Sequence, residues 1–165
     1  MIFVTVGTHE QQFNRLIEYI DTLKRDGIIN EEVIIQTGFS TYEPKYCKWN
    51  KIIPYQEMIK NIADARIVIT HGGPATFITP LQVGKIPIVV PRQIQYREHV
   101  NNHQVDFVKE MSRRKSAIIP VYDISDLEQK IVNYDTIIRN LSEKNISNNA
   151  LFCEKFEKIV NKLLS

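Results

Sequence analysis

Residues Val68–Arg92 read VITHGGPATFITPLQVGKIPIVVPR and predict a strand, a helix and a second strand in succession. The apolar run 67–69 indicates a buried strand, and the residues THGG at 70–73, which end in two glycines, indicate a turn. Pro74 suits the first position of a helix, because the N–H that proline lacks would have had no partner there. Gly84 ends the helix, and the run 87–90 predicts the second buried strand. The segment therefore predicts a βαβ unit.

Two glycines stand where the first of these strands passes into the helix. Gly72 and Gly73 allow a ligand to approach the backbone closely, and a helix N-terminus offers free N–H groups and a dipole that favour an anion. His71 adds a side-chain donor, so the pattern favours a diphosphate. It matches neither a P-loop nor a GxGxxG fingerprint, which argues against ATP and dinucleotides. A tight turn without a ligand, and a histidine that belongs to the core, remain the alternatives.

The composition describes an ordinary globular chain. Its 165 residues fit a single domain, 1–165, with 43% hydrophobic and 24% charged residues. The net charge of +2 gives no argument for binding nucleic acid. Cys47 and Cys153 have no metal-ligand spacing, which favours a reducing, cytoplasmic setting. No apolar run approaches the ~18 residues that a membrane-spanning helix needs, so we expect any membrane association to depend on another component.

Strands alternate with helices along the chain, which predicts an α/β fold: a Rossmann-like, three-layer parallel sheet with helices on both faces. The predicted strands are 2–6, 33–36, 52–53, 67–69, 87–90 and 117–120, the predicted helices are 10–25, 55–63, 74–83, 98–111, 123–140 and 146–164, and 37–50 is predicted to be a loop. Ligands of such sheets bind beyond the carboxyl ends of the strands. The turns expected at that edge are Gly7-Thr8, Thr37-Gly38, Pro54-Tyr55, His71-Gly72-Gly73 and Arg92-Gln93.

A dense set of hydrogen-bonding side chains follows the last strand of the βαβ unit. It consists of Arg92, Glu98, His99, Asn101, Asn102, His103 and Gln104. Sugar hydroxyls need paired donors and acceptors, which these residue types supply. A solvated loop and helix start is the alternative interpretation. A metal site is not expected, because the two histidines lack the HExxH pattern and no third ligand is evident.

Together these segments make the chain resemble the donor-binding half of the GT-B glycosyltransferases, and in particular the glycosyltransferase family 28 C-terminal domain. The resemblance is closest to its stand-alone subunits, found in dolichol-linked glycan assembly and in bacterial capsule and exopolysaccharide synthesis. The segments that carry it are FVTVGT at 3–8, QTG at 36–38, ADARIVITHGG at 63–73, LQVGKIPIVVPR at 81–92 and EHVNNHQ at 98–104.

The resemblance implies a UDP-sugar as donor substrate and no separate cofactor. The residues expected to hold it are Gly7, Thr8, Pro54, Tyr55, Gly72, Gly73, Ala75, Thr76, Thr79, Arg92, Glu98, His99, Asn102, His103 and Gln104, with His71 on the diphosphate and Met58 beneath the uracil. Thr79 stands where many relatives carry a glutamate that chelates the ribose hydroxyls. A threonine makes one such bond instead of two.

The resemblance also implies an inverting transfer of a hexose, galactose or GlcNAc-like, to a polyprenyl-diphosphate-linked acceptor in surface polysaccharide synthesis. His71 would assist departure of the UDP, and His9 and Glu10 are candidates for the general base, as is a residue of a partner. Without a DxD-like carboxylate pair, we expect no requirement for Mg²⁺. The acceptor would be bound by a membrane-anchored partner subunit, which would hold the chain at the inner face of the plasma membrane; a homo-oligomer is also compatible with the sequence.

Two other functions share this architecture. A non-catalytic subunit that activates or stabilises its partner is favoured by the threonine at position 79. Half of a nucleotide-sugar epimerase would act on the donor without an acceptor.

Overall fold

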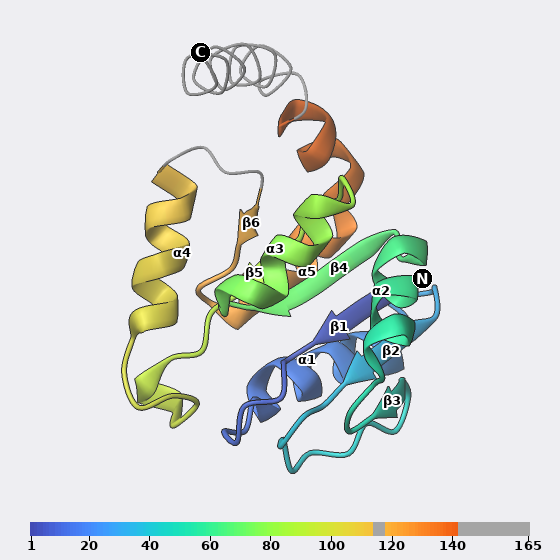
Figure 1. Ribbon diagram of the computed structural model, residues 1–165. Helices are drawn as coiled ribbons and strands as arrows, with labels where there is room; N and C mark the ends of the chain where they lie inside the picture. Colours follow the sequence, from blue (N-terminus) through green and yellow to red (C-terminus); the bar gives the residue numbers. More distant parts are fainter. Residues whose placement is uncertain (114–117, 142–165) are drawn as a thin grey trace, which may run out of the picture. The chain divides into compact units, whose positions relative to one another are not determined.

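The computed structural model describes residues 1–113 and 118–141, whose elements are drawn in Figure 1. In this part of the chain, six strands form one sheet in the order β3-β2-β1-β4-β5-β6, and all neighbouring strands are parallel. They are β1 Ile2–Thr5, β2 Val33–Gln36, β3 Lys48–Asn50, β4 Ile67–His71, β5 Ile88–Val90 and β6 Ile119–Pro120. The Rossmann-like α/β fold predicted from the sequence is confirmed.

Helices cover both faces of this sheet. They are α1 Asn14–Arg25, α2 Tyr55–Asp64, α3 Pro74–Gln82, α4 His103–Arg113 and α5 Leu127–Val132, with short 3-10 helices η1 Ile94–Tyr96 and η2 Ile124–Asp126. Figure 1 shows α2 and α3 on one face and α1 on the other. Because both faces are covered, β1 and β4 are buried along their whole length, as parallel strands require.

The core beneath α2, α3 and α4 consists of two apolar clusters. Ile62 of α2 packs with Phe3 and Val68 of the central strands. Phe77 of α3 packs with Val89 and Val108, and its ring lies 5.7 Å from that of Phe107. These contacts hold α2, α3 and α4 against the sheet, at whose carboxyl edge the candidate site lies.

The chain divides into two compact units, Met1–Val132 and Asn133–Ser165. In the second, residues 134–141 are helical. The helix predicted at 146–164 lies outside the described residues. Within 1–113 and 118–141, no helix combines the length and the apolar character needed to cross a bilayer.

The third strand lies outside the predicted position 52–53 and within the predicted loop 37–50. β3 is an edge strand whose three residues are all exposed, so it carries no apolar signal that a sequence pattern would reveal. Ile52, which suggested the strand, is 57% exposed. The rest of the loop is held by the buried Asp21 carboxylate, which accepts hydrogen bonds from the backbone of residues 45–47 and from the Tyr42 hydroxyl.

Three predicted helices differ from those observed. α1 begins at Asn14 instead of residue 10, because Gly7 has a φ of +75° and the following residues form a turn. α4 begins at His103 instead of residue 98, because Arg97 has a φ of +53° and the preceding loop turns its polar groups inward. The helix predicted at 123–140 is divided into η2, α5 and the helix 134–141, with a turn at residue 133.

Candidate functional site

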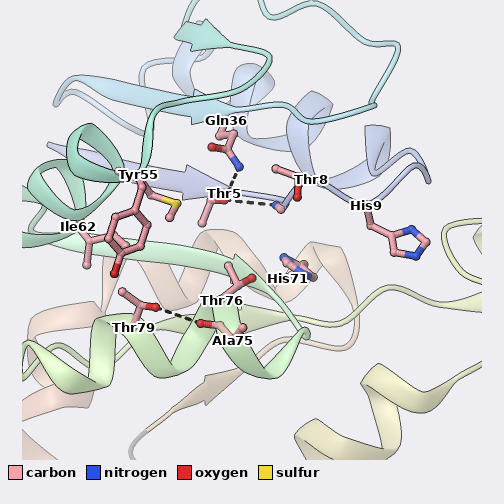
Figure 2. Close-up of a pocket in the computed structure, with 12 residues that line it drawn as sticks. Thr5, Thr8, His9, Gln36, Tyr55, Ile62, His71, Ala75, Thr76 and Thr79 are labelled. Atoms are coloured by element: carbon pink, nitrogen blue, oxygen red, sulfur yellow. Dashed lines mark hydrogen bonds between the residues drawn. The ribbon is translucent and has the colours of Figure 1, made fainter.

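A cavity of about 550 Å³ lies at the carboxyl ends of β1, β2 and β4. Figure 2 shows it between the turn after β1 on one side and helix α3 on the other. It is lined by Thr5, Gly7, Thr8, His9, Gln36, Tyr55, Met58, Ile62, His71, Ala75, Thr76 and Thr79. This is the edge at which ligands of parallel α/β sheets bind. Nine of the residues proposed from the sequence as catalytic or donor-binding are among the lining residues: Gly7, Thr8, His9, Tyr55, Met58, His71, Ala75, Thr76 and Thr79.

One end of the cavity is apolar and carries an aromatic ring. Tyr55, Met58 and Ile62 of α2 form it, and the Tyr55 side chain is 71% exposed. The backbone just before α2 is fixed from inside the protein, because the amide of Ile53 donates to the side-chain oxygen of Gln36 at 3.1 Å. A flat, partly apolar group fits this end.

The other end presents backbone donors. The amides of Thr8 and Ala75, which line the cavity, and that of Gly73, which lines the neighbouring one, make no hydrogen bond to any residue in the described part of the chain, whereas the amide of Gly72 donates to Gln104 Oε1 at 3.1 Å. Two of the free amides lie at the start of α3, where the helix dipole adds partial positive charge. Of the two glycines from which the sequence predicts a diphosphate cradle, Gly72 therefore has an occupied amide and Gly73 a free one.

His71 closes the floor of the cavity between two glycines. A Cβ atom at Gly7 would lie 2.6 Å from its Cε1, and one at Gly73 would lie 2.4 Å from its Nε2. The imidazole is 8% exposed, and its Nδ1 is buried without a hydrogen bond. Burial, together with the positive charge of Arg92, lowers the pKa of His71 to about 3, although the Thr5 carbonyl acts in the opposite direction. At neutral pH His71 therefore offers one N–H and no charge.

Three of the residues predicted to contact the sugar, His99, His103 and Gln104, line a second cavity of about 500 Å³, formed at the starts of α3 and α4. Its lining consists of Gly72, Gly73, Pro74, His99, His103, Gln104, Asp106 and Phe107. The rings of His9 and His99 are 5.9 Å apart. Asn102 does not line this cavity; its side-chain oxygen accepts from the Ile94 amide and shapes the preceding loop.

A model of the glycosyltransferase family 28 C-terminal domain matches residues 1–163. The chain belongs to this family. No curated protein sequence matches it, but several solved glycosyltransferases have a similar fold. The glycotransferase of kitacinnamycin is 13% identical, with a TM-score of 0.58 over 86% of this chain and 37% of that one.

Two further structures resemble the family 28 domain. The glycosyltransferase SnogD from Streptomyces nogalater is 17% identical, with a TM-score of 0.55 over 85% of this chain and 36% of that one. CalG4, the calicheamicin glycosyltransferase, is 12% identical, with a TM-score of 0.52 over 99% of this chain and 44% of that one. The chain thus spans between 36% and 44% of the length of these structures. At this identity the likeness shows a common fold.

Two residues that the sequence predicts to bind the sugar point into the protein instead. Glu98 is fully buried and accepts two hydrogen bonds from Arg15, at 2.8 and 2.9 Å, and one from the Gln93 amide. Arg92 is 1% exposed and donates to the carbonyls of Val6 and Gln11. In this conformation both residues hold loops in place, and neither lines one of the two cavities.

Sequence reasoning missed several lining residues of the family 28 domain. Thr5 and Gln36 form the floor of the first cavity, where Gln36 Nε2 lies 3.3 Å from Thr5 Oγ1 (Figure 2). Both are polar residues at the carboxyl end of an otherwise apolar strand, which is the signal that would have identified them. Asp106 and Phe107 line the second cavity but carry no distinguishing pattern. Conversely, Glu10 and Pro54 line neither cavity.

Proposed function

We propose that this chain is the donor-binding part of an inverting glycosyltransferase. It would transfer a hexose from a UDP-sugar to a polyprenyl-diphosphate-linked acceptor in surface polysaccharide synthesis. The observation that carries the proposal is the cavity of about 550 Å³, which has an apolar end with an aromatic ring and an opposite end where the amides of Thr8 and Ala75 make no hydrogen bond within the described residues. A nucleoside diphosphate has the same polarity along its length, with a flat base at one end and two phosphoryl groups at the other.

The proposed orientation follows from this polarity. The uracil would lie against Tyr55 and Met58, and the diphosphate would receive hydrogen bonds from the amides of Thr8, Gly73 and Ala75. The hexose would then extend past His71 towards the second cavity, where His103 and Gln104 supply hydrogen-bonding groups. Negative charge that develops on the departing UDP would be stabilised by donors that are already in place.

The general base would have to reach the acceptor hydroxyl. His9 lines the cavity and its side chain is exposed, so it is the stronger of the two candidates in this chain. Glu10 is exposed on the same turn but does not line the cavity. A residue of the acceptor-binding partner remains the alternative, because the acceptor would approach from that side.

We propose that a membrane-anchored partner subunit binds the acceptor and holds this chain at the cytoplasmic face of the membrane. Residues 1–165 match less than half the length of the solved glycosyltransferases, and a partner subunit would supply an acceptor-binding half. We further propose that the donor needs no metal cofactor.

Calorimetric titration tests the donor assignment. UDP should bind more tightly than uridine, because only UDP reaches the free amides, and ADP should bind more weakly than UDP. Equal affinity for UDP and uridine would contradict the diphosphate cradle. Co-expression with the candidate membrane partner, followed by a donor screen on lipid-linked acceptor with and without EDTA, tests transfer and metal independence together.

A second candidate function, a non-catalytic subunit that activates its partner, is favoured by Thr79. Its hydroxyl donates to the carbonyl of Ala75 at 3.0 Å, within its own helix, instead of pointing a free donor into the cavity (Figure 2). The same titration distinguishes the two functions, since a subunit that only supports a partner has no need to bind UDP.

A further inference from the structure

A buried positive charge supports the turn that lines the proposed diphosphate site. The Arg92 guanidinium donates to Val6 O at 2.8 Å and to Gln11 O at 2.7 Å, and these two carbonyls lie at the two ends of the turn that carries Gly7, Thr8 and His9. The backbone amide of Arg92 shares Gln104 Oε1 with the amide of Gly72, at 3.1 Å each. Arg92 thus connects the turn that lines the first cavity with Gly72 and Gln104, which line the second.

A second arginine and a carboxylate complete this cluster. Arg15 of α1 makes a two-point ion pair with the buried Glu98. The ring of Phe13 lies 5.1 Å from the Arg92 guanidinium and 5.5 Å from that of Arg15, so one aromatic side chain contacts both cations. We call Arg15, Glu98 and Arg92 the charge cluster.

The charge cluster carries one net positive charge, since two guanidinium groups face a single carboxylate. Burial lowers the pKa of Arg92 to about 10, and the Glu98 charge opposes that shift, so Arg92 stays protonated at neutral pH. Its Nε atom is buried without a hydrogen bond. Burying a charge that has no direct ionic partner is costly, and an anion bound next to the cluster would offset that cost.

We propose that the charge cluster attracts the diphosphate and that Arg92 is a positioning residue that also holds the phosphate-binding turn in shape. This inference rests on the proposed function. It gives the site a source of positive charge that His71, as a neutral imidazole, does not supply. The charge acts through low-dielectric protein, where electrostatic interactions are stronger than in water.

Substitutions that change the cluster's charge in opposite directions test the proposal. Arg92→Gln removes one positive charge and the contacts of Arg92 with the turn. Arg15→Gln removes one positive charge but leaves the contacts of Arg92. Glu98→Gln removes the negative charge and so raises the net charge of the cluster by one. Arg25→Gln is the matched control, because this exposed arginine lies at the far end of α1, paired with Asp26. Each variant is titrated with inorganic diphosphate, UDP and uridine after its fold is checked by circular dichroism.

Arg92→Gln and Arg15→Gln should weaken diphosphate and UDP binding roughly tenfold, the effect of one unit charge acting over several ångströms of protein interior. Glu98→Gln should strengthen both by a similar factor, and none of the variants should change uridine affinity. If Arg92→Gln fails to fold, Arg15→Gln and Glu98→Gln still give opposite signs.

Weaker diphosphate binding in Glu98→Gln as well would mean that the cluster acts only through structure, which overturns the proposal. Diphosphate affinities equal to that of Arg25→Gln in all three variants would also overturn the proposal. Wild-type protein that binds diphosphate as tightly as UDP, with the expected variant effects, would refute the UDP assignment while the charge cluster stands. Wild-type protein that binds neither would refute both.

Discussion

The buried, neutral His71 should make the protein less stable in mild acid. The pKa of His71 is about 3 in the folded protein and 6.5 in its ordinary state, so between these values the unfolded chain binds a proton that the folded chain does not. Stability is therefore complete above the unfolded pKa and falls as the pH decreases below it. The loss is about 1.4 kcal/mol for each pH unit below 6.5, or roughly 2 kcal/mol near pH 5.

Urea unfolding of wild type and His71→Gln between about pH 8 and pH 5 measures this loss. Glutamine does not titrate, so the stability difference between the two proteins should shift by about 2 kcal/mol in favour of the variant as the pH falls. Contributions from all other groups cancel in that difference. His103→Gln, which removes an exposed imidazole, controls for the loss of a histidine as such. Parallel stability curves for wild type and His71→Gln would show that the imidazole titrates normally and would refute a dry, neutral histidine at the cavity floor.

Two further substitutions test the geometry of the cavity. Thr79→Glu should give a bidentate contact with the ribose and tighten UDP binding roughly tenfold, in line with a charged hydrogen bond of about 1.5–3 kcal/mol. Calorimetry with UDP and 2′-deoxy-UDP measures this gain. An equal gain for both ligands would contradict the ribose contact. Gly73→Ala should cost about 1–3 kcal/mol in unfolding free energy, because a Cβ would lie 2.4 Å from His71 Nε2 although the backbone φ of −74° suits alanine. The same change in a His71→Ala background should cost much less, and additive effects in that double mutant would show that the imidazole is not the obstacle.

The sequence predicted the sheet well because its central strands must be apolar on both faces. β1, β4 and β5 were found from runs such as Val68–Ile69, which the structure buries completely. The edge strand β3 escaped prediction because its residues face solvent, and its position follows from pairing with β2 and not from its own composition. Element type could therefore be predicted where burial imposes a pattern, as in the edge strand β6 with its buried Ile119, but not in β3, whose residues are all exposed.

Side-chain direction explains why the candidate site was predicted less completely than the fold. From the sequence, Arg92 and Glu98 are predicted to contact the sugar, because they belong to a set of hydrogen-bonding side chains that follows a strand. The structure turns both inward, and the reason lies far away in the sequence, in the carbonyl of Val6 and the guanidinium of Arg15. No local pattern reveals such a partner. A glutamate eight residues after a buried strand looks the same whether it binds a hydroxyl or an arginine of α1.

The same contacts divide the requirements of a diphosphate site between His71 and the charge cluster. A cradle for a diphosphate needs hydrogen-bond donors at defined positions and positive charge within reach. His71, confined between Gly7 and Gly73, is suited to the first requirement only, because burial and then the charge of Arg92 disfavour a positive charge on the imidazole. The charge then resides on a guanidinium that stays protonated at neutral pH. If this division is correct, diphosphate affinity should be insensitive to pH between about 6 and 8 as far as His71 is concerned, and should respond instead to every change in the charge of the Arg15, Glu98 and Arg92 cluster.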